Sequence, residues 1–165
     1  IDDIRGNVDT RISKMLNGEF DGLVMAAAGI ERLGLQEHVT EYFDTDQMLP
    51  APGQGAISVE VNKKNNELFE MLKNICDEET DLCTYYERSF MNELGGGCNS
   101  PIGAYAFILN NKMKITGAIL SLDGKQVYKR SLEKDFGNDI NIGKLLAVDL
   151  IKSGANEIIK KLTIE

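Results

Sequence analysis

The chain of 165 residues has no tryptophan, a single histidine and only three cysteines. Three cysteines are too few, and odd in number, for a disulfide framework, so the composition favours a reducing, cytoplasmic setting. Cys76 and Cys83 are seven residues apart, without a Cys-x-x-Cys pair, and His38 is the only other soft ligand. The sequence therefore predicts no metal site.

Long apolar runs are also missing. The longest, residues 22–30, is about half of the roughly 20 residues that a membrane helix needs. The first residues, Ile1-Asp2-Asp3, lack both an initiator methionine and the pattern of a signal peptide. We therefore expect no membrane span, and we interpret the chain as a piece of a longer protein.

Positive charge is scarce as well, because 18 basic residues face 26 acidic residues and the net charge is −8. This balance argues against a nucleic-acid partner. Three of the five arginines, Arg5, Arg11 and Arg32, nevertheless lie in the first 60 residues, which are the most acidic part of the chain. Hydrophobic residues make up 42%, which is enough for a folded core.

The periodicity of apolar residues predicts two structural parts. In the first, a helix over 8–18 precedes a buried strand over 22–28, and a loop over 47–56 carries two of the three prolines. A strand over 56–61 and a helix over 66–75 follow. In the second, a helix over 79–94 precedes strands over 102–109, 113–122 and 126–132, joined by turns at Asn110-Asn111 and Asp123-Gly124. A helix over 142–162, weakened by Gly154, closes the chain.

These elements predict an α/β plus α+β fold class. A partial α/β domain, similar to those of binding proteins, is followed by a small domain of helices and a three-stranded antiparallel sheet.

Cys98 follows three glycines, Gly95, Gly96 and Gly97, at the end of a predicted helix. One interpretation is a glycine C-cap followed by a small buried cysteine, because free cysteines are often buried. The other is an accessible thiol that carries a group covalently. Cys76 and Cys83 are predicted to be core residues.

A second motif runs from Arg5 through Gly6 and Asn7 to Arg11, with Arg32 further on. Arginine binds carboxylates bidentately through its planar guanidinium. Asn7 is suited to the N-cap of the following helix. The alternative is ordinary helix capping with surface arginines.

The segment from Pro50 to Gly55 is either a plain linker or a rigid crossing that places the Gln54 amide along a cleft between domains. It lacks the glycine and lysine spacing of a phosphate-binding loop. Glu87 and Arg88 form either an exposed pair on a helix or a contact from a helix to a loop.

Several of these motifs occur together in one known family. The chain resembles porphobilinogen deaminase, also called hydroxymethylbilane synthase, over essentially its whole length. The resemblance is carried by Arg5-Gly-Asn-Val-Asp-Thr-Arg11, Ala26-Ala-Ala-Gly-Ile-Glu-Arg-Leu-Gly34, Leu49-Pro-Ala-Pro-Gly-Gln-Gly-Ala56, Glu87-Arg88 and Gly96-Gly-Cys-Asn-Ser-Pro-Ile-Gly-Ala104.

The resemblance implies a cytoplasmic transferase of tetrapyrrole and heme biosynthesis. The family enzyme joins four porphobilinogen molecules head to tail, with loss of ammonia, to give hydroxymethylbilane. Growth starts on a dipyrromethane cofactor, which a thioether would attach to Cys98. The other implied site residues are the carboxylate-binding Arg5, Arg11 and Arg32, the cleft-lining Gly6, Asn7, Gln54 and Gly55, and the loop residues Gly96 and Gly97.

The resemblance also implies a division of the chain. Residues 1–49 match the latter part of the family's domain two, residues 50–55 an inter-domain crossing, residues 56–75 a segment that returns to domain one, and residues 78–165 the C-terminal, cofactor-carrying domain three. The family's catalytic aspartate lies upstream of these matches, so we expect this chain to be inactive alone. Its partners would be porphobilinogen, the growing oligopyrrole and the N-terminal region of the same protein, with a monomeric full-length enzyme.

A different class of function also fits the residues. In that alternative the chain is a non-catalytic α/β module that binds a small carboxylate through its arginines, and Cys98 is structural.

Overall fold

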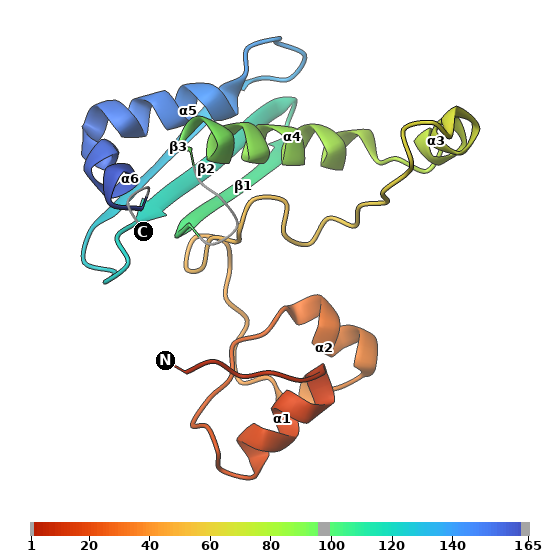
Figure 1. Cartoon of the computed structure of the whole chain (residues 1–165), viewed down its shortest axis with the longest axis vertical. Helices are drawn as coiled ribbons and strands as arrows, with labels where there is room; N and C mark the ends of the chain where they lie inside the picture. Colours follow the sequence, from red (N-terminus) through yellow and green to blue (C-terminus); the bar gives the residue numbers. More distant parts are fainter. Residues whose placement is uncertain (1, 96–99, 163–165) are drawn as a thin grey trace. The chain divides into compact units, whose positions relative to one another are not determined.

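The computed structural model describes residues 2–95 and 100–162, and the chain divides after Phe43 into two units (Figure 1). The first unit contains α1 (Val8–Leu16), α2 (Ala27–Leu33) and the short 3-10 helix η1 (Gln36–His38). Ile12 of α1 and Ile30 of α2 are its buried residues. The helix predicted over 8–18 is confirmed, and it ends two residues early, before the left-handed Gly18.

The strand predicted over 22–28 is wrong. Residues 22–26 have no regular structure, Val24 is 65% exposed, and Ala27 already belongs to α2. An isolated strand leaves its backbone donors and acceptors unpaired. No other segment of residues 2–43 forms a strand that could pair with this one.

A three-stranded antiparallel sheet organises the second unit. Its strands β1 (Ile102–Leu109), β2 (Lys112–Leu120) and β3 (Val127–Asp135) lie in the order β1-β2-β3. In the register, Ile115 pairs with Ala106 on one side and with Leu132 on the other. Both hairpins and all three strands were predicted from the sequence and are confirmed.

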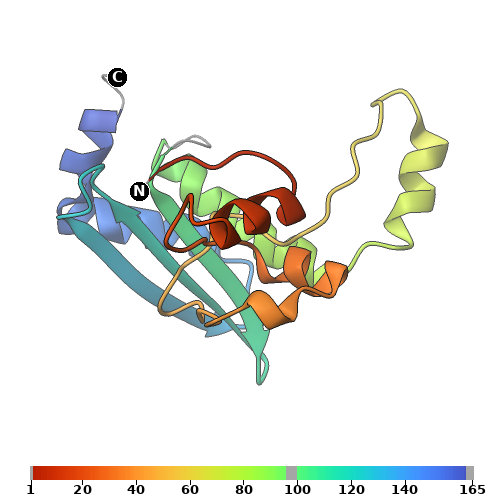
Figure 2. The same cartoon turned by 90° about the horizontal axis from the view of Figure 1, so that it is seen from below.

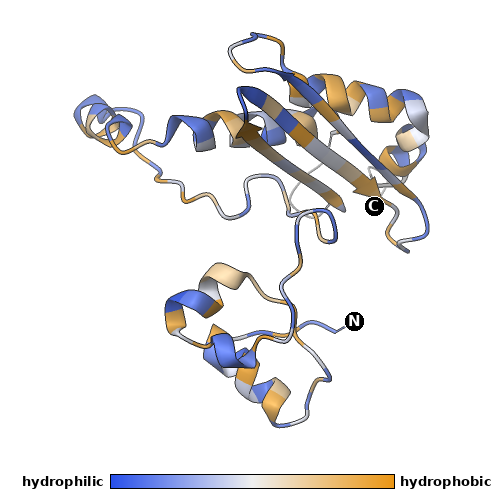
Figure 3. Cartoon of the chain, turned by 180° about the vertical axis from the view of Figure 1, so that it is seen from behind, coloured by the Kyte–Doolittle hydropathy of each residue, from blue (hydrophilic) through white to orange (hydrophobic). Residues whose placement is uncertain are grey.

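Two helices, α4 (Glu78–Glu93) and α5 (Ile142–Leu150), cover one face of this sheet (Figures 1 and 2). Phe90 of α4, Ile115 of β2 and Leu146 of α5 are fully buried between the layers. Gly117 lets them approach, because a Cβ atom there would lie 2.6 Å from the Phe90 ring. Figure 3 shows that hydropathy falls across the sheet, from an apolar β1 to a hydrophilic β3. The predicted small domain of helices and an antiparallel sheet is thus confirmed.

The C-terminal helix is interrupted at the predicted weak point. α5 continues into a short π-type segment, η2 (Ile151–Ala155), and then into α6 (Asn156–Leu162). Gly154 has a φ of +113°, outside the helical range, and its Cα faces the Tyr128 hydroxyl of β3. The single helix expected over 142–162 is therefore bent into separate pieces.

The second unit begins with a long irregular stretch. The predicted strand over 56–61 is wrong, because these residues pair with no strand and Ile57 is 96% exposed. α3 (Asn66–Lys73) confirms the predicted helix, yet none of its residues is buried. Figures 1 and 2 show α3 standing clear of the sheet.

Candidate functional site

The turn before α1 holds two of the candidate arginines in one local structure. Gly6 has a φ of +127°, and a Cβ atom there would approach Thr10 Cγ2 to 2.9 Å, so glycine is required. The Gly6 carbonyl accepts a hydrogen bond of 2.7 Å from Arg11 Nε. This bond brings the Arg11 guanidinium to the residue that follows Arg5.

Asn7 is the N-cap residue of α1, as predicted. Its backbone is extended, and its carbonyl accepts the first helical bond, 3.0 Å from Arg11 N. Its side chain makes no capping hydrogen bond. The side-chain part of the capping expectation is therefore wrong.

Arg32 lies in the last turn of α2 and is exposed. A cation suits that end of a helix, where backbone carbonyls lack partners. In the part of the chain that the structure describes, none of Arg5, Arg11 and Arg32 forms an ion pair with a carboxylate. Among the described residues, these three guanidiniums thus have no carboxylate within ion-pair distance, although they lie in the most acidic part of the chain.

The proline-rich segment, residues 50–55, is hydrogen-bonded to strand β1 within the second unit. The Pro50 carbonyl accepts a hydrogen bond of 2.9 Å from the Ala104 amide of β1. Gln54 closes a tight turn, because its amide donates to the Ala51 carbonyl and its side-chain oxygen accepts from the Ala51 amide. The segment is therefore a structured turn bound to β1, and its place along a cleft between domains stays a prediction.

Glu87 is the residue that sequence reasoning undervalued. It is 4% exposed, and its carboxylate accepts amide hydrogen bonds of 2.7 Å from both Gly53 and Ala106. Of the two interpretations, the contact from a helix to a loop is the correct one. The signal was present in the spacing, because Glu87 is four residues after buried Cys83 and three before Phe90, on one face of α4. Burial raises the pKa of Glu87, while its two amide bonds and neighbouring Arg88 oppose that rise.

The predicted attachment residue Cys98 and its neighbours Gly96 and Gly97 lie outside the described residues. The other two cysteines differ from each other: Cys83 is buried in the core, as predicted, but Cys76 is exposed, so that expectation is wrong. Cys76 comes after the end of α3 and just before the α4 N-cap Asp77. The apolar face of α4 therefore does not reach Cys76.

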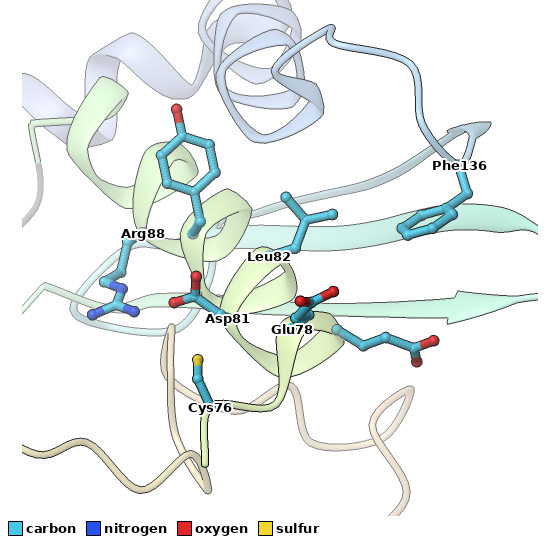
Figure 4. Close-up of a pocket in the computed structure, with 8 residues that line it drawn as sticks. Cys76, Glu78, Asp81, Leu82, Arg88 and Phe136 are labelled. Carbon is cyan, nitrogen blue, oxygen red and sulfur yellow. The ribbon is translucent and has the colours of Figure 1, made fainter. Parts of the chain in front are cut away.

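A cavity of about 590 Å³ opens beside the first half of α4 (Figure 4). It is lined by Cys76, Glu78, Glu79, Asp81, Leu82, Tyr85, Arg88 and Phe136. Three of these side chains are carboxylates, and the only guanidinium already donates to the backbone and hydroxyl oxygens of Thr84. The cavity is therefore poorly suited to a ligand that is itself rich in carboxylates, and it contains none of the predicted site residues.

No helix in the described ranges is long and apolar enough to cross a membrane. Among the same residues, histidine, cysteine, aspartate and glutamate form no group of three or more that could hold a metal ion.

Two domain models of one family match the chain, each over nearly half of its length. Residues 1–70 match "Porphobilinogen deaminase, dipyromethane cofactor binding domain", and residues 81–152 match "Porphobilinogen deaminase, C-terminal domain". The first match contains the three arginines and Gln54. The second contains Glu87 and Cys98.

Curated relatives agree with these two matches. The chain is 41% identical over 160 residues to a porphobilinogen deaminase of Macrococcus caseolyticus, covering 96% of this chain and 52% of the relative. It is 40% identical over 161 residues to one of Francisella philomiragia, with coverages of 98% and 53%. It is 41% identical over 157 residues to one of Alkaliphilus metalliredigens, with coverages of 95% and 50%. The chain thus spans about half the length of these relatives.

Proposed function

The chain belongs to the porphobilinogen deaminase family, and we propose that it is part of a cytoplasmic transferase that builds a linear tetrapyrrole. The proposed reaction joins four porphobilinogen molecules head to tail to give hydroxymethylbilane. Each condensation forms one carbon–carbon bond, while the carbon–nitrogen bond of an aminomethyl group breaks, a ring carbon loses its proton and one molecule of ammonia leaves. One water molecule supplies the hydroxyl group of the released product. The residues described here would bind and orient the substrate and its product.

The observation that carries this proposal is the set of three arginines that have no carboxylate partner among the described residues. Each porphobilinogen ring carries an acetate and a propionate, so every condensation adds two carboxylates to the bound product. Guanidiniums bind carboxylates through paired, charge-assisted hydrogen bonds. Arg5, which is exposed, and Arg11, which is half-buried, offer such donors in one turn held by the bond from Arg11 Nε to the Gly6 carbonyl.

The same donor set fits the dipyrromethane cofactor, whose two rings carry the same carboxylates. We assign its covalent attachment to Cys98 and its carboxylates to Arg5, Arg11 and Arg32. Gly6, Asn7, Gln54 and Gly55 would line the cleft beside it, and Gly96 and Gly97 would leave room around the thiol. When bound, the cofactor supplies the pyrrole position to which the first substrate is joined.

We further propose the division of the chain into domains that the family resemblance implies. Residues 1–49 belong to a second domain, residues 50–55 cross between domains, residues 56–75 return to a first domain, and residues 78–165 form the third. The exposed apolar residues of 56–75, such as Ile57 and Phe69, support this, because a large exposed apolar surface usually has a partner. The complete enzyme would be a monomer, with the catalytic aspartate in its N-terminal region.

The decisive experiment is intact-mass analysis of the full-length protein after denaturation, combined with Ehrlich's reagent. The unsubstituted protein should retain a covalently bound dipyrrole. Cys98→Ser should lose it, whereas Cys83→Ser, the matched control, should retain it. A dipyrrole still bound in Cys98→Ser would overturn the assignment of Cys98, and a full-length protein without any covalent pyrrole would favour the carboxylate-binding module.

The arginines are tested by kinetics on the same full-length protein. Arg5→Gln and Arg32→Gln should each lower kcat/KM for porphobilinogen by about 10- to 100-fold, since a hydrogen bond to a charged group contributes about 1.5–3 kcal/mol. Arg130→Gln is the control, because Arg130 pairs with Asp149 at 3.1 Å in the second unit. Equal effects of all three substitutions would contradict the proposed carboxylate sites.

The 165-residue chain itself should form no product from porphobilinogen. Steady formation of hydroxymethylbilane by the purified chain would show that the upstream region is dispensable.

A further inference from the structure

Glu87 is the only buried acidic side chain among the described residues. It lies in the middle of α4, with fully buried Phe90 on the same helix face. Its two carboxylate oxygens have different partners: Oε1 accepts from the Ala106 amide, and Oε2 accepts from the Gly53 amide, each at 2.7 Å. One side chain therefore joins a helix, an edge strand and the proline-rich crossing.

The strand partner explains why a carboxylate is needed at this place. β1 is an edge strand, so its outward-facing amides have no neighbouring strand to pair with. The Ala104 amide donates to the Pro50 carbonyl, and the next outward amide, that of Ala106, donates to Glu87. Without Glu87, the buried Ala106 amide would lose its acceptor, which is costly for a buried donor.

The crossing is held at two points, one on β1 and one on α4. One is the Pro50 carbonyl, where the chain passes so close that a Cβ atom on Gly103 would lie 3.1 Å from the Leu49 carbonyl oxygen. The other is the Gly53 amide, whose acceptor is the Glu87 carboxylate. Gly53 lies inside the turn that Ala51 and Gln54 close. The position of the turn, and of Gln54 on it, therefore depends on the Glu87 carboxylate.

We propose that Glu87 is a positioning residue, which clamps the crossing 50–55 to α4 and β1 and thereby sets the place of Gln54 and Gly55 along the substrate cleft. This inference rests on the proposed function for the identity of the cleft. The clamp itself rests on the described contacts alone.

The chemistry of the clamp requires two acceptors. A glutamine at position 87 has one acceptor oxygen, and its NH₂ group would point at an N–H donor. Glu87→Gln keeps the size of the side chain and can satisfy only one of the two amides. Glu87→Ala can satisfy neither.

The test is amide hydrogen exchange, residue by residue, in the 165-residue chain. Glu87→Ala should speed exchange at Gly53 and Ala106 by at least tenfold, and Glu87→Gln should do so at one of them. The exchange rates of the Ile115 and Thr116 amides of β2 should stay unchanged in both variants. In the control Glu93→Gln, the exchange rates of all four amides should stay unchanged. In Glu87→Ala, equal acceleration at Ile115, or an unchanged Gly53, would overturn the clamp.

A second measurement needs no substitution and so carries no risk of unfolding. In the unsubstituted chain, the amide proton shifts of Gly53 and Ala106 should change with pH at the same midpoint as the shift of the Glu87 carboxyl carbon. Both amides donate to that carboxylate, so all three shifts report its protonation. Separate midpoints, or a Gly53 shift that does not move, would overturn the clamp.

The functional half is tested in the full-length protein. Glu87→Ala should retain its covalent dipyrrole but lose at least about tenfold in kcat, since displaced groups align poorly with the substrate. An unchanged kcat with accelerated exchange at Gly53 in the same variant would overturn the positioning role and leave the clamp intact. If no full-length variant carries any pyrrole, the proposed function fails, and the exchange result still stands by itself.

Discussion

Gly143, at the start of α5, lies so close to the main chain of Tyr86 in α4 that a Cβ atom at position 143 would overlap the Tyr86 carbonyl oxygen. The same Cβ atom would lie 3.2 Å from the Phe90 amide nitrogen. The two helices therefore meet backbone against backbone, without an intervening side chain. This contact sets how deeply α5 can pack over the sheet beside α4.

The first prediction concerns this contact. Gly143→Ala should lower the free energy of unfolding by about 1–3 kcal/mol or more, because main-chain atoms cannot rotate away from the added methyl group. Lys144→Ala, at the next and exposed position, should change it by less than about 0.5 kcal/mol.

Urea unfolding followed by tyrosine fluorescence measures both variants. The chain has no tryptophan, and four of its five tyrosines lie in residues 44–165, so the signal reports chiefly on the second unit. Coincident unfolding curves for the two variants would show that α4 and α5 can separate without cost.

The second prediction concerns Lys134 of β3. Its ammonium donates to the Tyr86 hydroxyl at 2.8 Å, to the Ile140 carbonyl at 2.6 Å and to the Asn138 carbonyl, and it lies 4.5 Å from the centroid of the Tyr86 ring. Lys134→Met should destabilise the second unit by about 1.5–3 kcal/mol, since it removes charge-assisted hydrogen bonds.

Lys125→Met provides the control, because the Lys125 side chain is 82% exposed and its ion pair with Asp123 lies on the surface. Its midpoint of thermal unfolding should stay close to that of the unsubstituted chain. If Lys134→Met matches it, the carbonyls around Lys134 are satisfied by water instead.

The third prediction concerns the turn between β1 and β2. Asn110 and Asn111 have φ values of +51° and +59°, in the left-handed region that suits a tight hairpin. Asn111→Val should cost about 1–2 kcal/mol, since a β-branched residue strongly disfavours that region. Asn111→Gly should be nearly neutral in the same urea titration, and a valine variant as stable as the glycine variant would contradict the turn conformation.

The fourth prediction concerns the reactivity of the two described cysteines. Burial, and secondarily the nearby Glu87 carboxylate, raises the pKa of the Cys83 thiol to about 11. At pH 8 only about one Cys83 in a thousand is then a thiolate, and at pH 10 this fraction is about a hundredfold larger. Cys76 is exposed, and iodoacetamide should modify it well before Cys83 at pH 8.

Peptide mass mapping after timed alkylation measures each site, and Cys76→Ser identifies its peptide. Addition of urea should remove the difference between the two cysteines. Equal rates in the folded protein at pH 8 would mean that Cys83 is open to solvent.

Local patterns predicted well wherever the elements satisfy their own hydrogen bonds or pair with their nearest neighbours. Helices α1, α3 and α4 follow from apolar periodicity, and the two hairpins follow from alternation interrupted by turn residues. The bend at Gly154 was visible as a weak point of the last helix. These features depend on residues that are close in the sequence, so a single sequence contains them.

The failures have one physical cause. Residues 22–28 and 56–61 have the composition of strands, but a strand exists only where a second strand accepts its hydrogen bonds. The apolar pattern of a segment indicates a preference for the extended conformation, but it does not indicate which segment would pair with it. The prediction that Cys76 is a core residue failed for a similar reason, because its burial depended on how far the apolar face of α4 extends.

The sequence by itself determined the family, the helices and hairpins of the second unit, and the arginine-rich turn, because motifs and local periodicity carry that information. Only the tertiary structure decided that Glu87 points inward to two distant amides and that Gly143 brings two helices into main-chain contact. Both depend on segments that are far apart in the chain, and the folded packing alone brings such segments within hydrogen-bonding or van der Waals distance.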